Sequence, residues 1–484
     1  MRRLRVLLAT PPYHCGMLEA AGGWLPLGLV YLAGEVRRRG HEVAIYDAMT
    51  LFHGWEEIAR VVEDFRPDVL GIGAITATVK DALKFCALAK EISPGVVTVL
   101  GNVHPTFMSE EVLSSGAVDF VVRGEGEITF AELVDCLAEV GDPSRVSGLS
   151  FLKDGGVFHT PDRPFIRDLD SLSPAWDLLD WSIYTYHPRP GSRLAIVSSS
   201  RGCVSQCLFC SQRLFWKGAW RARSPESFVA ELELLRERYG VDVVMISDEY
   251  PTRDRVRWER ILDLLIERDL GMEILMETRV DDIVRDEDLM EKYRAAGVSH
   301  IYVGVEAPDQ KRVDEYRKNI RVEDSRRALE IINRADIISE TSFVVGTPDE
   351  TPENLKATLE LAKFYDPDMA FFLPLTPWPY TPMYERYKKH IEVHDWSRYN
   401  LVEPVIKPRA LSRKELRRLL LTSTGEFFKH KLSQFPRLSP FKRNFMLRVL
   451  GLMVERSYLS EEMQRVLLPF RAFLSRKKAG RGWP

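Results

Sequence analysis

Ser200-Arg-Gly-Cys-Val-Ser-Gln-Cys-Leu-Phe-Cys-Ser-Gln212 is the stretch of the chain that decides the fold. It places Cys203, Cys207 and Cys210 on one short loop with the spacing Cys-x3-Cys-x2-Cys, directly after an apolar run. Three thiolates on one loop can bind three irons of a [4Fe–4S] cluster and leave the fourth iron without a protein ligand. A structural zinc site is the alternative, but it needs a fourth Cys or His, and the loop contains none. The spacing therefore predicts a cluster with one open iron.

Short apolar runs alternate with amphipathic helical stretches around and after this loop. Such alternation is typical of βα units, in which helices cover a parallel sheet. The expected strands cover residues 194–199, 243–247, 272–276, 300–305, 342–345 and 370–373, and the clearest helices cover 227–239, 256–266, 286–296 and 353–364. Six units at this spacing predict a partial (β/α) barrel over residues 191–405, with its chemistry at the carboxyl ends of the strands.

The same alternation precedes the loop, in the first part of the chain. Expected strands cover residues 4–9, 42–46, 69–74, 96–100 and 120–122, and expected helices include 25–39, 79–92 and 129–138. This pattern predicts a doubly wound, flavodoxin-like α/β domain over residues 1–145. Ligands of such domains lie beyond the carboxyl ends of the strands, so the loops that follow the strands are the candidate binding segments.

Two further segments have a different character. Residues 146–190 are irregular and rich in proline, with a hairpin turn at Lys153-Asp-Gly-Gly156, and are expected to form a connector. Residues 406–484 are expected to form a helical C-terminal region, for example over 412–427 and 445–454. Residues 411–484 hold 17 Lys and Arg but 5 Asp and Glu. This excess fits an internal docking surface, peripheral contact with a membrane surface, or a solvated helix face.

Composition excludes several classes of protein. The 484 residues are 45% hydrophobic and 28% charged with a net charge of −3, so nothing points to a nucleic-acid partner. The six cysteines are too few for a disulfide scaffold, and three of them lie within eight residues, which favours a metal site in a reducing compartment. No apolar run reaches the roughly 18 residues that a membrane span needs. We therefore expect a cytoplasmic protein.

The cysteine loop and the strand ends that follow it resemble the radical S-adenosylmethionine (SAM) superfamily over about residues 194–375. The resemblance implies that the open iron binds SAM and that the reduced cluster cleaves it to a 5′-deoxyadenosyl radical. It also implies site residues, although each alone could be a surface charge or a helix cap. These are Phe209 beside the cluster, Glu249 with Asp248 as second candidate near the SAM amino group, Arg279 at its carboxylate, Glu306 at the ribose, and Gly346 in the adenine-binding stretch Phe343-Val-Val-Gly-Thr-Pro-Asp-Glu350. That stretch lacks the first glycine of the family pattern.

The N-terminal domain resembles the cobalamin-binding domain of one large radical SAM subfamily. Gly101-Asn-Val-His-Pro-Thr106 is similar to its Gly-Gly-x-His-x-Thr loop, with Asn102 in place of the second glycine, and Gly124-Glu-Gly-Glu127 is similar to another of its loops. The implied cobalamin contacts are Thr76, Thr78, Gly101, Asn102, His104, Thr106, Gly124, Glu125 and Gly126. The Asp-x-His-x-x-Gly motif of methionine-synthase-type domains is missing, and His14 is a candidate cobalt ligand. The alternative is a sheet that has lost its corrinoid.

Additional motifs resemble the anaerobic magnesium-protoporphyrin IX monomethyl ester oxidative cyclase group. They include Gly22-Gly-Trp24-Leu-Pro26, Asp248-Glu-Tyr-Pro-Thr252, Thr278-Arg-Val-Asp281 and Thr376-Pro-Trp-Pro-Tyr-Thr-Pro382. The resemblance implies an oxidative cyclase with a tetrapyrrole substrate and a reducing electron donor such as flavodoxin or ferredoxin. A cobalamin-dependent radical SAM C-methyltransferase has the same visible motifs and is the alternative. A methylthiotransferase lacks support because no second cysteine group is present, and a sensor lacks support because no output module is recognisable.

Overall fold

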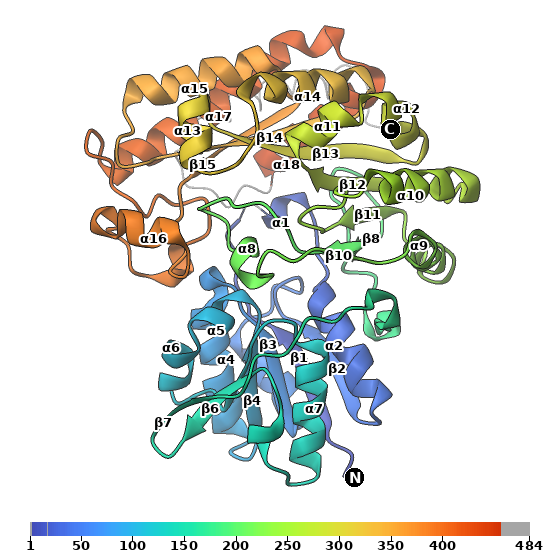
Figure 1. Ribbon diagram of the computed structural model, residues 1–484, viewed down its shortest axis with the longest axis vertical. Helices are drawn as coiled ribbons and strands as arrows, with labels where there is room; N and C mark the ends of the chain where they lie inside the picture. Colours follow the sequence, from blue (N-terminus) through green and yellow to red (C-terminus); the bar gives the residue numbers. More distant parts are fainter. Residues whose placement is uncertain (1, 17, 456–484) are drawn as a thin grey trace.

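The computed structural model describes residues 2–16 and 18–455 and shows two α/β bodies stacked end to end (Figure 1). The N-terminal body contains a seven-stranded sheet in the order β2-β1-β3-β4-β5-β6-β7. Its strands are β1 (Arg5–Thr10), β2 (Glu42–Asp47), β3 (Val69–Gly73), β4 (Val97–Gly101), β5 (Phe120–Val122), β6 (Leu149–Lys153) and β7 (Gly156–His159). The first five are parallel in the 2-1-3-4-5 order of flavodoxin-like folds, which confirms the predicted fold class.

The last two strands depart from the prediction. The segment predicted as a connector begins with the hairpin β6-β7, which pairs antiparallel with β5 and extends the sheet. The predicted turn is present at Asp154 and Gly155, and both residues have left-handed backbone angles. The pairing of β6 with β5 was not, because nothing local to the hairpin specifies which sheet edge it joins.

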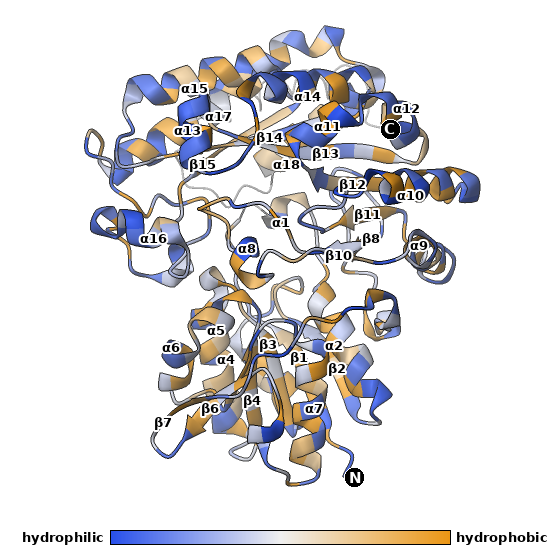
Figure 2. Cartoon of the chain, viewed as in Figure 1, coloured by the Kyte–Doolittle hydropathy of each residue, from blue (hydrophilic) through white to orange (hydrophobic). Residues whose placement is uncertain are grey.

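Helices cover both faces of this sheet and bury its alternating apolar side chains. Leu7 and Ala9 of β1 pack with α3 (Trp55–Phe65) and α4 (Val79–Ile92). Val6 and Leu8 face α2 (Leu27–Arg38) and α7 (Glu127–Ala138). Short helices α1 (Leu18–Ala21), α5 (Val103–Phe107) and α6 (Ser109–Ser114) lie in the connections. Figure 2 shows the apolar residues of this body concentrated along the central strands.

The second body is a six-stranded parallel sheet in the order β15-β14-β13-β12-β11-β8. Its strands are β8 (Leu194–Val197), β11 (Val243–Ile246), β12 (Glu273–Thr278), β13 (Val298–Glu306), β14 (Ile338–Val345) and β15 (Met369–Pro374). Among the described residues β8 and β15 do not pair with each other, so the barrel is partial, as predicted. All six expected strands are present, and β13 and β14 begin earlier than the sequence indicated.

Helices of this body cover the outside of the sheet (Figure 1). The helices up to α15 are α9 (Pro225–Tyr239), α10 (Arg255–Arg268), α11 (Val280–Arg285), α12 (Met290–Ala295), α13 (Gln310–Glu315), α14 (Val322–Arg334) and α15 (Pro352–Tyr365). The short helix α16 (Pro382–Tyr387) follows β15 and lies to one side of the sheet. The helix expected over 286–296 is in fact a 3₁₀ turn, Glu287–Leu289, followed by α12. Two long helices follow, α17 (Arg413–Gln434) and α18 (Pro440–Glu455), which confirms a helical region up to the end of the described chain.

Most of the basic excess counted over 411–484 lies in or beyond these helices, and residues 456–484 lie outside the described part of the chain. Among the described residues, no helix combines the length and the apolarity needed to cross a bilayer.

Candidate active site between the two domains

The two ends of the cysteine loop lie next to each other. It begins after β9 (Ser200–Arg201) and, after α8 (Gln212–Phe215), returns through β10 (Arg221–Ala222), which pairs antiparallel with β9. Gly202 opens the loop at φ 96°, and a side chain there would meet the carbonyl oxygen of Ala219 at 2.1 Å, so only glycine fits. The N–H of Leu208 donates to the backbone carbonyl of Tyr316 at 3.0 Å, and the Phe209 ring packs edge-on against the Tyr316 ring. The loop is therefore held from both sides.

The three cysteines of the loop are available as cluster ligands. All three are free thiols, and Cys207 is buried. Three thiolates on one loop can bind three irons of a cubane and leave the fourth iron open. Burial raises the pKa of the Cys207 thiol, while the Lys318 ammonium acts in the opposite direction and favours the thiolate that iron requires.

Asp248 and Glu249, the two carboxylates after β11, both face the start of the cysteine loop. Asp248 is buried and accepts hydrogen bonds from the N–H of Ser199 at 2.8 Å and from the hydroxyls of Ser199 and Ser200 at 2.6 and 2.7 Å. Its oxygens are thus engaged with the segment that leads into the loop, a contact set that favours a positioning role over the predicted contact with SAM. Glu249 accepts from the N–H of Gly202 at 3.0 Å and from Trp216 Nε1 at 2.7 Å, and it also lines the main cavity.

Arg279 contacts the cysteine loop, and its charge is already paired; its predicted role at the SAM carboxylate stays a prediction. Its guanidinium donates to the hydroxyl of Ser205 at 2.7 Å and to Asp281 at 2.9 Å. These side chains, with Tyr250 and Asn319, border a cavity of about 580 Å³ beside the cysteine loop. A ligand carboxylate at Arg279 would therefore share this cation with Asp281.

Glu306 reveals a partner that sequence reasoning missed. It ends β13 at φ 67°, and its Oε1 lies 2.7 Å from the Lys318 ammonium, with both side chains largely buried. Arg317 and Asn319, on either side of Lys318, also have left-handed backbone angles. Nothing in the local sequence separates Lys318 from the basic residues around it. The predicted role of Glu306 at the ribose stays a prediction.

Gly346 adopts φ 80° after β14, and its N–H donates to the buried carboxylate of Glu350 at 2.8 Å. A side chain at this position would press on Leu416 of α17 at 2.9 Å. The Leu416 side chain could shift, so the left-handed backbone angle is the stronger reason for glycine here. Its predicted place beside adenine stays a prediction.

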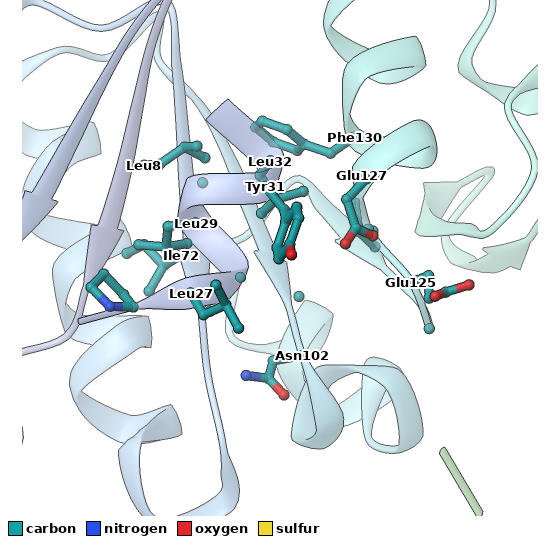
Figure 3. A pocket seen from close by; sticks show the side chains of 18 of the residues that line it. Leu8, Leu27, Leu29, Tyr31, Leu32, Ile72, Asn102, Glu125, Glu127 and Phe130 are labelled. Carbon is teal, nitrogen blue, oxygen red and sulfur yellow. The ribbon is translucent and has the colours of Figure 1, made fainter. Parts of the chain in front are cut away.

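A cavity of about 450 Å³ opens at the carboxyl ends of β1, β3, β4 and β5 (Figure 3). Its inner part is apolar and is lined by Leu8, Leu32, Ile72 and Phe130. Five predicted cobalamin residues line it: Gly101, Asn102, Gly124, Glu125 and Gly126. Its outer part reaches the barrel side, where Ser198, Arg201, Trp216 and Glu249 contribute. The cavity therefore joins the two candidate cofactor regions.

Four other predicted cobalamin residues lie outside the lining of this cavity. Thr106 accepts a hydrogen bond from the N–H of Gly124 at 3.0 Å and so ties the two strand-end loops together. Thr78 caps its own turn by accepting from the N–H of Ile75. Thr76 bonds to His104 Nδ1 and to the hydroxyl of Tyr380, each at 3.1 Å. In this structure these side chains support the loops that contain them, and their predicted contact with cobalamin stays a prediction.

The two histidines singled out from the sequence are held by neighbouring rings and carboxylates. His104 is fully buried, and burial lowers its pKa to about 4, so its ring is neutral. His14 stacks on Phe52 at 4.4 Å, and its Nδ1 lies 3.5 Å from Glu19. A bond from His14 to cobalt stays a prediction.

Known proteins resemble this chain in both domains. Residues 13–134 match the B12 binding domain family, and residues 197–362 match the radical SAM superfamily. The anaerobic magnesium-protoporphyrin IX monomethyl ester cyclase of Rubrivivax gelatinosus is 37% identical over 440 residues, which is 90% of this chain and 79% of the relative. An uncharacterized methyltransferase of Pyrococcus horikoshii is 31% identical over 433 residues, 88% of this chain and 93% of that protein.

Among solved structures, the cobalamin-dependent SAM radical enzyme OxsB, with aqua-cobalamin and SAM bound, superimposes with a TM-score of 0.71 at 18% identity, over 98% of this chain and 75% of OxsB. At that identity the match supports the fold alone. Together with the two family matches and the 37% identity, the evidence identifies the family. The chain belongs to the cobalamin-binding radical SAM enzymes, whose cofactors are a [4Fe–4S] cluster, SAM and cobalamin, and within them to the group that includes the anaerobic magnesium-protoporphyrin IX monomethyl ester cyclases.

Proposed function

We propose that this protein is an anaerobic oxidative cyclase that acts on magnesium-protoporphyrin IX monomethyl ester or a closely related tetrapyrrole. The observation that carries the proposal is the 37% identity to the cyclase of Rubrivivax gelatinosus over 440 residues. The methyltransferase of Pyrococcus horikoshii aligns over nearly the same length, 433 residues, but at 31% identity. The higher identity, and not the length of the match, favours the cyclase.

The arrangement of the two domains supports a substrate site between them. The cysteine loop lies between the barrel and the N-terminal sheet (Figure 1). The segment after β15 reaches across to the N-terminal domain, where Tyr380 stacks on Phe107 at 4.8 Å. Cys203, Cys207 and Cys210 would hold the cluster, which would supply the electron for SAM cleavage, and cobalamin would act on the substrate carbon. The protein's own contribution is to hold both cofactors against one substrate and to exclude solvent where the domains meet.

We place the nucleotide tail of cobalamin in the 450 Å³ cavity. Its apolar inner walls suit a flat aromatic base, and glycines at its rim allow close approach of the backbone. The tail would then lie away from the cobalt. An electron donor of the flavodoxin or ferredoxin type is part of the same proposal.

A C-methyltransferase is the second candidate. The 31% identity to a methyltransferase, over 93% of that protein's length, favours it. Both functions use the same cofactors and differ in what becomes of the substrate carbon.

Product stoichiometry separates the two functions. With reconstituted protein, reductant and the tetrapyrrole substrate, a cyclase forms 5′-deoxyadenosine without S-adenosylhomocysteine. A methyltransferase forms both in comparable amounts, because a second SAM supplies the methyl group. In ¹⁸O-labelled water the cyclase product gains solvent oxygen. Substrate-dependent S-adenosylhomocysteine, together with a mass gain of one methylene, would overturn the cyclase proposal and leave the radical mechanism intact.

A further inference from the structure

Glu125 has contacts that its predicted role does not explain. It was predicted to touch cobalamin, yet its carboxylate is occupied by protein groups. Oε1 lies 2.9 Å from Arg201 Nη1, and both oxygens lie 2.9 Å from Arg221 Nη1. Oε2 also accepts from the N–H of Ile166 at 2.8 Å. The Glu125 side chain is only 4% exposed, so water has little access to its carboxylate.

The two arginines stand at the two ends of the cysteine loop. Arg201 belongs to β9 and Arg221 to β10, and these short strands pair with each other at that position. All three cysteines lie between the arginines in the sequence. One carboxylate of the N-terminal domain therefore holds both ends of the loop that carries the cluster ligands.

Neighbouring contacts extend this arrangement toward both cofactor sites. Arg201 Nη2 also pairs with Glu127 at 2.7 Å, so the Gly124–Glu127 loop is held by two of its residues. The Arg221 guanidinium lies over the Trp216 ring at 5.4 Å, and Trp216 in turn donates to Glu249 at 2.7 Å. A continuous set of contacts thus runs from the rim of the cobalamin cavity to the carboxylate expected at SAM.

Loss of the Glu125 carboxylate would leave the Arg221 guanidinium without the counter-ion it has in this structure, whereas Arg201 would keep its ion pair with Glu127. Within the described residues, Nε and Nη2 of Arg221 have no hydrogen-bond partner, so Nη1 makes its polar contacts with Glu125 and Ile166. An unpaired buried charge is strongly unfavourable. The β10 end of the loop would have to move until solvent reached the Arg221 guanidinium.

We propose that Glu125 is a positioning residue that fixes the cysteine loop on the cobalamin domain and so couples the two cofactor sites. When cobalamin binds against Gly124–Gly126 at the cavity rim, it fixes the position of the Glu125 carboxylate. That carboxylate in turn fixes both ends of the cysteine loop. By reciprocity, an assembled cluster favours cobalamin binding to the same degree. The proposal rests on the family's cofactors and holds whether the reaction is cyclisation or methylation.

Glu125→Gln in the full-length protein tests the proposal without any turnover. Cobalamin affinity is titrated by absorbance with and without the reconstituted cluster. In the wild type we expect the cluster to tighten cobalamin binding on the order of tenfold, within the usual range of coupling between linked sites. In Glu125→Gln this gain should vanish. The magnetic interaction between cob(II)alamin and the reduced cluster, measured by EPR, should weaken or broaden.

Lys217→Gln is the control. It breaks an ion pair of the segment that carries the cysteine loop, Lys217 with Asp162 at 2.7 Å, but both side chains are about 60% exposed, and Asp162 keeps its contact with Arg123. Such pairs contribute little, so the coupling should stay at the wild-type value. If Glu125→Gln does not fold, Glu125→Asp keeps the charge and withdraws it by one methylene, and it should give a reduced coupling.

Wild-type coupling and an unchanged EPR interaction in a folded Glu125 variant would overturn the proposal. A wild-type protein that binds only one of the two cofactors would instead contradict the family's cofactor set, which makes the two failures distinguishable.

Discussion

Gly101→Leu tests whether the 450 Å³ cavity receives cobalamin, and the structure allows its effect to be separated from misfolding. A Cβ on Gly101 would have its nearest neighbour, the Val122 carbonyl oxygen, at 3.5 Å, which is an ordinary contact. Other glycines at the cavity are poorer choices. A Cβ on Gly71 would meet Leu8 at 2.8 Å, and Gly124 needs φ 70°. Gly101 therefore accepts a side chain that takes up ligand space and leaves the fold intact.

The size of the effect follows from overpacking. A bulky group in a site that is filled when the ligand binds costs about 1–3 kcal/mol. Because each 1.4 kcal/mol is tenfold in affinity, cobalamin should bind about 5-fold to about 150-fold more weakly. Hydroxocobalamin titration followed by absorbance measures the affinity, and thermal unfolding of the cofactor-free protein checks stability. Gly95→Leu, at an exposed turn before β4 with no atom within 4 Å of its Cβ, is the control. Wild-type affinity in a folded Gly101→Leu protein would refute the cavity assignment.

Two further predictions concern the cluster and a buried acid. Anaerobic reconstitution should yield about four irons and four sulfides per chain, and alanine at Cys203, Cys207 or Cys210 should abolish this, while Cys86→Ala keeps it; a wild-type protein that binds zinc and no iron would contradict the assignment. Burial raises the pKa of Glu277 from 4.5 to about 7. Because the folded-state pKa is the higher one, the stability from Glu277 is full below pH 4.5 and is lost as the pH rises through 7, by at most about 3 kcal/mol. Glu277→Gln should therefore unfold at a higher temperature than the wild type at pH 8, with a smaller difference near pH 5; a gap independent of pH would contradict this account.

The fold could be predicted from the sequence because its signals are local. Each βα unit has an apolar strand and an amphipathic helix, and the chirality of the connections leaves few ways to assemble them. The hairpin β6-β7 shows the limit. Its turn was visible in Lys153-Asp-Gly-Gly156, but its attachment to β5 depends on residues far away in the sequence.

The candidate site divides in the same way. The cysteine spacing is a local signal and can be read without tertiary information. The partners of a charged residue, in contrast, can be identified only from the tertiary structure. Asp248 was the second candidate for a SAM contact after Glu249, and the sequence did not indicate that Ser199 and Ser200 donate to its oxygens. Lys318 was not noticed at all, because only the fold brings it to Glu306. A motif thus predicts where a polar residue stands but not which of its neighbours it binds.

Two of the contacts between the domains differ in physical character. In one of them, His104 lies edge-on to Tyr380 at 6.4 Å and to Trp396 at 6.0 Å. Burial keeps the pKa of His104 at about 4, so its ring is uncharged at neutral pH, and its Nδ1 lies 3.1 Å from the Thr76 hydroxyl, which also bonds to Tyr380. The packed rings add apolar burial, which depends little on direction. The other contact is the buried Glu125 network, whose charge-assisted hydrogen bonds require defined distances and angles. The position of the cysteine loop relative to the Gly124–Glu127 loop therefore depends more on the ionic contact than on the aromatic one.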